Sequence, residues 1–138
     1  MGWIHDKVKE LKEKCKTNDP FEIATLQNIQ VVPWNLHEEI NGFYKYDRRN
    51  KYIFVNNNLS EEMQRFVCAH ELGHAILHPR ANTPFLRTNT FFSVDRIEVE
   101  ANTFAVHLLV RGEDFQNYET KQQLLKANGI PEIMEKFV

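Results

Sequence analysis

The segment Phe66-Val67-Cys68-Ala69-His70-Glu71-Leu72-Gly73-His74-Ala75-Ile76-Leu77 holds two histidines four residues apart, with a glutamate directly after the first. On an α-helix, residues i and i+4 lie about 40° apart around the axis and about 6 Å apart along it. His70 and His74 can therefore meet one metal ion. Glu71 lies about 100° from His70, where the H-E-x-x-H pattern of zinc hydrolases places a general base. We predict His70 and His74 as metal ligands and Glu71 as the catalytic base.

The residues around this motif predict a helix that is buried on all sides. They are apolar at nearly every position: Phe66, Val67, Cys68, Ala69, Leu72, Ala75, Ile76 and Leu77. Two histidines and a glutamate inside such a helix would lose hydration without compensation unless they were paired or bound to metal. A helix that carries two histidines for unrelated reasons is therefore the weaker interpretation.

A catalytic zinc site has three protein ligands and one open position for water, so one ligand has to come from elsewhere in the chain. The extended metzincin motif would need a glycine and a third histidine at positions that hold Leu77 and Arg80. That class is excluded, and an acidic ligand from a later helix is the remaining common solution. Glu98 and Glu100 are the two candidates.

The helical wheel of residues 94–110 separates the two candidates. Glu98 lies on an apolar face, whereas Glu100 points about 160° away, toward the polar face. The apolar face holds Ala101, Ala105, Leu108 and Leu109, and the polar face holds Arg96, Thr103 and His107. An ionised carboxylate on an apolar face is costly unless a cation is bound to it, so we predict Glu98 as the third ligand.

Asn102 follows Glu98 by one helical turn on the same face. It can hydrogen-bond a ligand imidazole or the ligand carboxylate, as partners of metal ligands commonly do. An asparagine satisfied by a nearby loop is the open alternative. Among the other histidines, His78 ends the motif helix about 12 Å from His70, too far to share its ion, and is expected to cap the helix or line a cleft. We expect His107 to be solvated.

The remaining sequence predicts an α+β fold with a small, largely antiparallel sheet. Apolar periodicity and capping residues predict helices over residues 3–16, 20–26, 94–110 and 120–127, a motif helix capped by Ser60 and ended by His78-Pro79, and a short helix opened by Pro131. Strands are predicted over 29–34, 42–46 and 51–56, with a hairpin loop at 47–50 and a long loop at 80–93. This sheet would pack on the motif helix and on the helix that bears Glu98.

Length and composition limit the class of protein. The 138 residues suit a single domain, 1–138. A net charge of -2 without a basic stripe disfavours direct binding to nucleic acid, so a protein partner is expected. Cys15 and Cys68 lack C-x-x-C spacing and are expected to be reduced core residues. No apolar run is long enough for a membrane span and no secretory signal is evident, so we expect a cytoplasmic protein without membrane contact.

The chain resembles the ImmA/IrrE family of zincin-like metallo-endopeptidases. The resemblance rests on segments 64–66, 69–78, 98–105 and 108–109, and a weaker match extends from Asp19-Pro20 to Gly129-Ile130-Pro131. Members usually carry a proline soon after the second leucine pair, where this chain has Val110-Arg111. The departure concerns a helix end and leaves the predicted ligands unchanged.

The resemblance implies a gluzincin-type zincin fold with His70, His74 and Glu98 as ligands and Glu71 as the base. It also implies an intracellular anti-repressor protease, of the kind encoded by phages and mobile elements, that cleaves a helix-turn-helix repressor. One Zn²⁺ ion is the expected cofactor, and Mn²⁺ or Fe²⁺ would suit the same ligands. The repressor is the expected partner.

Two other functions are compatible with the same residues. The first is a non-proteolytic regulator that binds a repressor or another partner and uses the metal for structure or sensing. Glu71 argues against it, because a structural site needs no base and usually closes its fourth position with another ligand. The second is a metallohydrolase that acts on a small amide.

Overall fold

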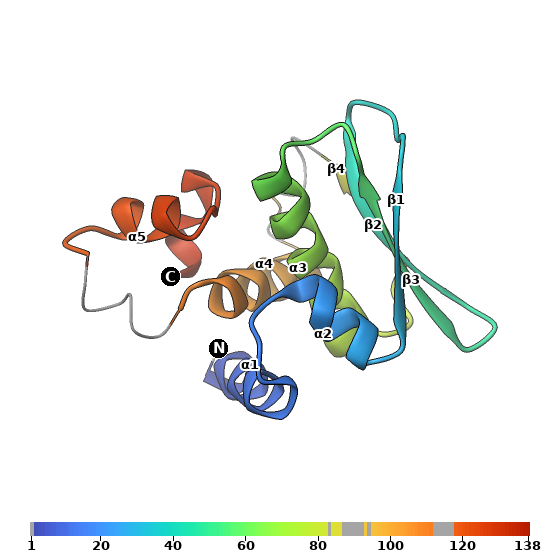
Figure 1. The fold of residues 1–138 in the computed structure, drawn as a ribbon, viewed down its shortest axis with the longest axis horizontal. Helices are drawn as coiled ribbons and strands as arrows, with labels where there is room; N and C mark the ends of the chain where they lie inside the picture. Colours follow the sequence, from blue (N-terminus) through green and yellow to red (C-terminus); the bar gives the residue numbers. More distant parts are fainter. Residues whose placement is uncertain (1, 83, 87–92, 94, 112–117) are drawn as a thin grey trace.

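A four-stranded sheet lies against one of two long helices that pack together at the centre of the molecule (Figure 1). The computed structural model describes residues 2–82, 84–86, 93, 95–111 and 118–138. The strands follow the order β1-β3-β2-β4 across the sheet. Their bounds are Ile29–Trp34 for β1, Ile40–Asp47 for β2, Asn50–Asn56 for β3 and Pro84–Leu86 for β4.

The predicted largely antiparallel sheet is confirmed, since β2 pairs antiparallel with both β3 and β4. In the β2–β3 hairpin, Asp47 pairs with Asn50. The two residues between them, Arg48 and Arg49, have φ of 50° and 68°. A two-residue hairpin turn of type I′ needs positive φ at both positions. The one departure is β1, which runs parallel to β3.

The long loop predicted over residues 80–93 is wrong at Pro84–Leu86, which form β4. A strand of three residues that starts with proline gives almost no periodic signal in the sequence. It forms because β2 offers an unpaired edge. Tertiary contacts hold the chain at this edge: Tyr44 on β2 donates its hydroxyl to the carbonyl of Pro79, and the Tyr46 N–H donates to the side chain of Asn82.

The helices agree with the predicted ones to within a residue or two at most ends. They are α1 (Gly2–Cys15), α2 (Pro20–Leu26), α3 (Glu61–Leu77), α4 (Arg96–Leu109), α5 (Lys121–Ala127) and the 3₁₀-helix η2 (Glu132–Phe137). Capping explains several starts, because the side chains of Asp19, Ser60 and Thr120 accept hydrogen bonds from backbone N–H groups of the first turns of α2, α3 and α5. The predicted start of α4 at Val94 lies outside the described residues.

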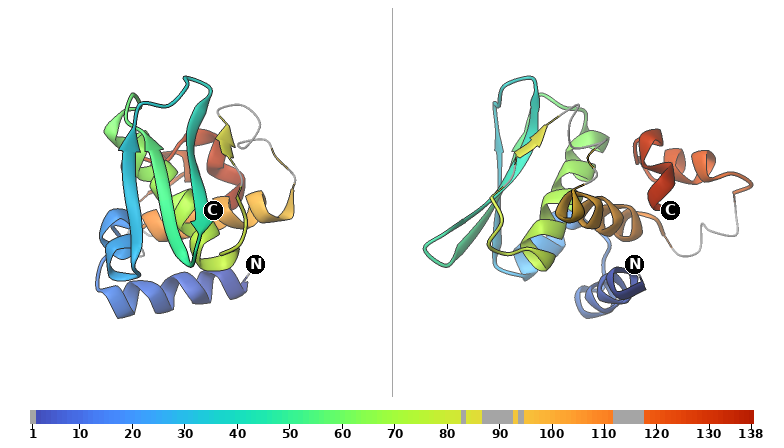
Figure 2. Two further views of the ribbon diagram at one scale, coloured as in Figure 1. Left: turned by 90° about the vertical axis from the view of Figure 1, so that its right-hand side faces the viewer. Right: turned by 180° about the vertical axis from the view of Figure 1, so that it is seen from behind.

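Helix α3 is the centre of the core. It lies between the sheet and α4, while α5 and η2 lie on the side away from the sheet (Figure 2). Ten consecutive residues of α3, from Phe66 to Ala75, are buried. The all-round burial predicted from the sequence is therefore confirmed, and any polar group on this stretch is removed from bulk water. Cys68 is a free, buried thiol on the same helix.

Two glycines permit the close packing around α3. A Cβ atom on Gly42 of β2 would lie 2.4 Å from the carbonyl oxygen of Phe54 and 2.6 Å from Cγ1 of Val67. A Cβ atom on Gly73 would lie 3.2 Å from the Phe104 side chain of α4. The sheet approaches α3 at Gly42, and α4 approaches it at Gly73.

We predict that Gly42→Ala lowers the free energy of unfolding by about 1–3 kcal/mol, because the added methyl group overpacks the contact between sheet and helix. Gly2→Ala is the matched control, since a Cβ atom there meets no heavy atom within 4 Å. Urea unfolding of the metal-free proteins measures both changes. Equal midpoints for Gly42→Ala and the parent chain would contradict the packing described.

Candidate active site

Helix α3 presents His70, Glu71 and His74 together in the interior. All three side chains are fully buried. One ligand atom from each lies within 4.8 Å of those from the other two, and in the described part of the chain no other group of three such residues has this geometry. The i, i+1, i+4 spacing on a buried helix thus produces the cluster predicted from the sequence.

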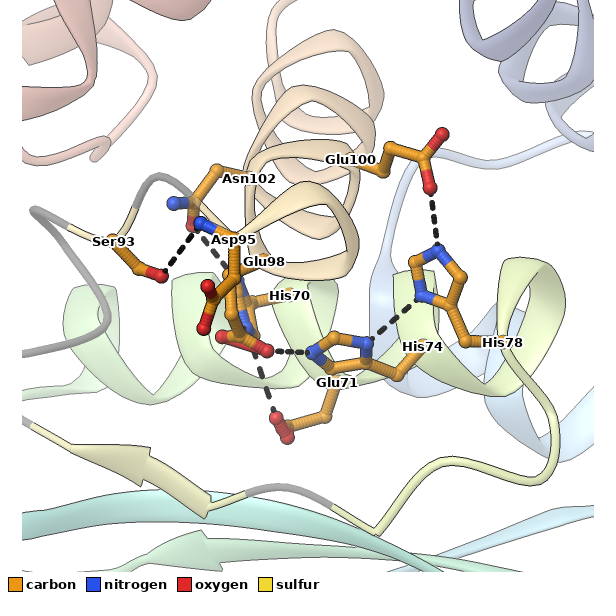
Figure 3. Close-up of polar contacts among 9 residues, drawn as sticks. All are labelled: His70, Glu71, His74, His78, Ser93, Asp95, Glu98, Glu100 and Asn102. Atoms are coloured by element: carbon orange, nitrogen blue, oxygen red, sulfur yellow. Dashed lines mark hydrogen bonds and ion pairs between the residues drawn. The ribbon is translucent and has the colours of Figure 1, made fainter.

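Helix α4 brings Glu98 to the same point (Figure 3). Its Oε1 lies 2.7 Å from Nε2 of His74, and its Oε2 lies 3.3 Å from Nε2 of His70. Glu98 belongs to the first turn of α4 and is 7% exposed. One carboxylate therefore faces the same ring nitrogen of both histidines, as the helical wheel predicted.

Burial and nearby charges shift the pKa values of the two glutamates of the site in opposite directions. Burial, reinforced by the nearby Glu98 charge, raises the pKa of Glu71 well above its usual value. Burial would also raise the pKa of Glu98, but its contacts with His70 and His74 outweigh that effect and hold it at about 2. Glu98 stays ionised, whereas Glu71 takes up a proton more readily than an exposed glutamate does. The difference separates an anionic ligand from an acid–base group.

Both histidines make contacts suited to metal ligands. Burial lowers the pKa of His74 despite its contacts with Glu98. Nδ1 of His70 lies 2.8 Å from Oδ1 of Asn102, which can only accept a hydrogen bond. His70 then carries its proton on Nδ1 and turns the lone pair of Nε2 toward Glu98. Asn102, which is fully buried, contacts a ligand imidazole as predicted.

Glu100 differs from the environment predicted for it, whereas His78 agrees with its prediction and makes an additional contact. Glu100 does point away from Glu98, but the expected polar face is covered and Glu100 is only 6% exposed. Its Oε1 lies 2.9 Å from Nε2 of His78. His78 caps α3 as expected, and its Nδ1 also lies 3.0 Å from Nδ1 of His74. The i+4 spacing from His74 to His78 was the available signal for this contact.

His107 was expected to be solvated, and it is instead half-buried between α4 and α1. Its ring makes an edge contact with the ring of His5, with 5.3 Å between centroids. Lys12 of α1 donates to the carbonyl of His107 at the C-terminal end of α4. Helix α1, predicted from sequence as a packing element, packs against the His107 end of the polar face of α4, and His107 has no part in the site.

The donor set fits a divalent transition metal. Imidazole nitrogens and a carboxylate are the ligand types that zinc takes in hydrolases, and two such imidazoles face one carboxylate here. Both oxygens of Glu71 are buried and accept no hydrogen bond from a residue that the structure describes. A buried carboxylate in that condition needs a proton or a donor, which a water molecule beside a metal would supply.

Comparison with known proteins identifies the family. Residues 24–137 match the peptidase M78 profile, described as the IrrE N-terminal-like domain. The chain belongs to this metallopeptidase family. It is 56% identical over 128 residues to an immunity region protein of Bacillus phage phi105, covering 90% of this chain and 81% of that protein. No solved structure gives a significant match.

A second family member is the metallopeptidase ImmA of Bacillus subtilis strain 168, to which the chain is 32% identical over 107 residues. The match covers 78% of this chain and 63% of ImmA. The resemblance to ImmA/IrrE proteins predicted from the two motif segments is therefore confirmed. No helix in the described residues combines the length and apolar character needed to cross a bilayer.

The geometry distinguishes two candidates for the third ligand, Glu71 and Glu98. We predict that Glu98→Gln weakens Zn²⁺ binding by about 100-fold or more, beyond the 10- to 100-fold typical of residues outside the coordination shell. Glu71→Gln, an equally isosteric change in the same cluster, is predicted to leave the affinity within a few-fold. Competition with a chromophoric chelator measures both. The reverse order of affinities would show that Glu71 is the ligand.

Proposed function

We propose that this chain is a zinc-dependent endopeptidase that cleaves a helix-turn-helix repressor. His70, His74 and Glu98 would hold the ion, and Glu71 would act as the general base. The observation that carries the proposal is the position of Glu71. It is a fully buried carboxylate with a raised pKa, and it adjoins two ligand imidazoles and lacks a hydrogen-bond donor among the described residues.

Different groups of the chain would have different roles in peptide hydrolysis. A bound divalent ion lowers the pKa of a water ligand toward about 7 and polarises the scissile carbonyl. Glu71 accepts the proton of the attacking water and delivers it to the leaving amine, for which a raised pKa is suitable. Glu98 cannot replace it, because its pKa of about 2 makes it a poor base.

Burial of the cluster supports hydrolysis by a small number of fixed groups. The side chains of His70, Glu71 and His74 are all inaccessible to bulk water in the absence of substrate. Charges act more strongly on one another in such surroundings than in water. The ligand rings are fixed before substrate arrives, because Asn102 and His78 contact the Nδ1 atoms of His70 and His74.

Membership of a peptidase family implies a protein substrate, and three considerations favour a repressor. A relative sharing 56% identity carries the name of a phage immunity region, and another is named ImmA. The resemblance to ImmA/IrrE proteins also implies a helix-turn-helix repressor as the substrate. The net charge of -2 disfavours binding of the chain itself to DNA phosphates, so its target would be the protein. An extended substrate segment could add to an edge of the sheet through main-chain hydrogen bonds.

Incubation of the Zn²⁺-loaded chain with the repressor encoded beside it, followed by intact-mass measurement, tests the proposal. We expect two fragments whose masses sum to that of the repressor plus one water, and their loss on addition of chelator. Glu71→Gln, loaded with Zn²⁺, is expected to slow cleavage by at least about 100-fold, the lower end of general-base contributions.

Two results would contradict the proposal. The first is an intact repressor after incubation with metal-loaded wild-type chain. The second is release of the repressor from its operator by wild type and Glu71→Gln alike, without a cut, which would identify a regulator that acts by binding.

A further inference from the structure

A row of three hydrogen-bonded side chains runs from His74 to the far side of α4 (Figure 3). Nδ1 of His74 lies 3.0 Å from Nδ1 of His78, and Nε2 of His78 lies 2.9 Å from Oε1 of Glu100. The row leaves His74 on the side opposite Glu98. Its two members beyond His74 lie outside the group of ligands and base, and no proton transfer in the peptidase mechanism above uses His78 or Glu100.

With Glu100 ionised and His78 neutral, the hydrogen bonds of the row have a single direction. An ionised Glu100 can only accept, so Nε2 of His78 carries a proton. A neutral His78 then has its lone pair on Nδ1, and that atom accepts from Nδ1–H of His74. His74 consequently has its lone pair on Nε2, the atom that faces Glu98 at 2.7 Å. This arrangement satisfies His78 and Glu100. It leaves two acceptors facing each other, Nε2 of His74 and the carboxylate of Glu98, and a bound cation would compensate them.

The surroundings of Glu100 are consistent with this directed row. Glu100 is 6% exposed, and a buried carboxylate is costly unless it is hydrogen-bonded. Its other oxygen lies 3.6 Å from Nε of Arg96, whose side chain is 86% exposed, so that ion pair is weakened by solvent. His78 is also tied by its backbone, because its N–H donates to the carbonyl of His74 at the end of α3.

We propose that His78 and Glu100 are positioning residues that hold His74 in the tautomer and ring orientation needed to bind the metal. The inference rests on the metal site of the proposed function. Partners of this kind make a ligand imidazole more basic and fix its ring. Asn102 does the same for His70 with a neutral amide. His74 differs in being linked through a second imidazole to a carboxylate on the neighbouring helix.

A bystander role is the competing explanation, in which His78 and Glu100 only join the end of α3 to α4. A structural role and a positioning role predict different effects when His78 or Glu100 is substituted. A structural link would affect the stability of the metal-free chain and would not discriminate among side chains that preserve the hydrogen bonds. A positioning role would affect metal affinity and the ligand field at equal stability, and a side chain with the same donor and acceptor pattern would restore both.

The experiment measures Zn²⁺ affinity by chelator competition, the visible spectrum of the Co²⁺-loaded chain and the melting temperature of the metal-free chain. We expect Glu100→Ala and His78→Ala each to weaken Zn²⁺ binding by about 10- to 100-fold and to alter the Co²⁺ spectrum. The double variant is expected to bind as His78→Ala does, because Glu100 acts through His78. His78→Gln is expected to recover most of the affinity, since its amide can accept from His74 and donate to Glu100.

Arg96→Ala and His107→Ala are the matched controls. Arg96 contacts Glu100 from the solvent side. His107 is a histidine on α4 that contacts His5 and lies away from the site. Both are expected to bind Zn²⁺ as wild type does. Comparable melting temperatures of the metal-free variants would assign the affinity losses to the site and exclude a loss of fold.

Three outcomes would overturn the proposal: wild-type affinity in both alanine variants, additive losses in the double variant, or no recovery in His78→Gln. Failure of the wild-type chain to bind Zn²⁺ would remove the metal site and this proposal with it. Zn²⁺ binding without repressor cleavage would contradict only the proposed function, because the affinity series would still decide the role of His78 and Glu100.

Discussion

The contact between α3 and α4 at Glu98 is the constraint on which the rest of the structure depends. It places one carboxylate within 2.7 and 3.3 Å of the Nε2 atoms of two buried histidines. Groups of this kind cannot be buried cheaply unless they are paired or bound to a cation. The two helices can meet so closely because Gly73 offers no side chain to the ring of Phe104. Packing and chemistry are therefore coupled at one interface.

The sheet completes this arrangement from the other side of α3. Its inner face, with Gly42 in close approach to Val67, buries the helix on which the histidines lie. Burial separates the pKa values of Glu71 and Glu98, although both are glutamates in one cluster. The contacts that Glu98 makes with two imidazoles keep it ionised, whereas the nearest imidazole nitrogen to Glu71, Nε2 of His70, lies 3.9 Å away. The difference in role follows from position alone.

Two periodic patterns in the sequence were sufficient to predict the residues of the site. His70 and His74 share a helix face by spacing, and Glu98 was separated from Glu100 by the apolar residues around it. Helix ends were predictable where caps such as Asp19 and Ser60 occur. These features depend on neighbours within one element, which is why a single sequence reveals them. The hairpin at Arg48-Arg49 was predictable for the same reason.

Features that depend on contacts between elements were missed. The polar face that holds Glu100 resembled a solvated surface, because nothing near it in sequence indicates that His78 of another helix would cover it. Strand β4 is too short for periodicity, and the parallel pairing of β1 with β3 is a matter of topology. His107 was assigned to solvent because the packing of α1 against α4 could not be inferred from either helix alone.

We infer that His70, His74 and Glu98 bind one ion while Glu71 stays outside the coordination shell. Anomalous X-ray scattering at the zinc edge, from crystals of the Zn²⁺-loaded chain, tests it most directly. The account predicts one peak per chain, at about 2.0–2.2 Å from Nε2 of both histidines and an oxygen of Glu98. A peak bonded to Glu71 in place of Glu98, or located elsewhere in the chain, would contradict it.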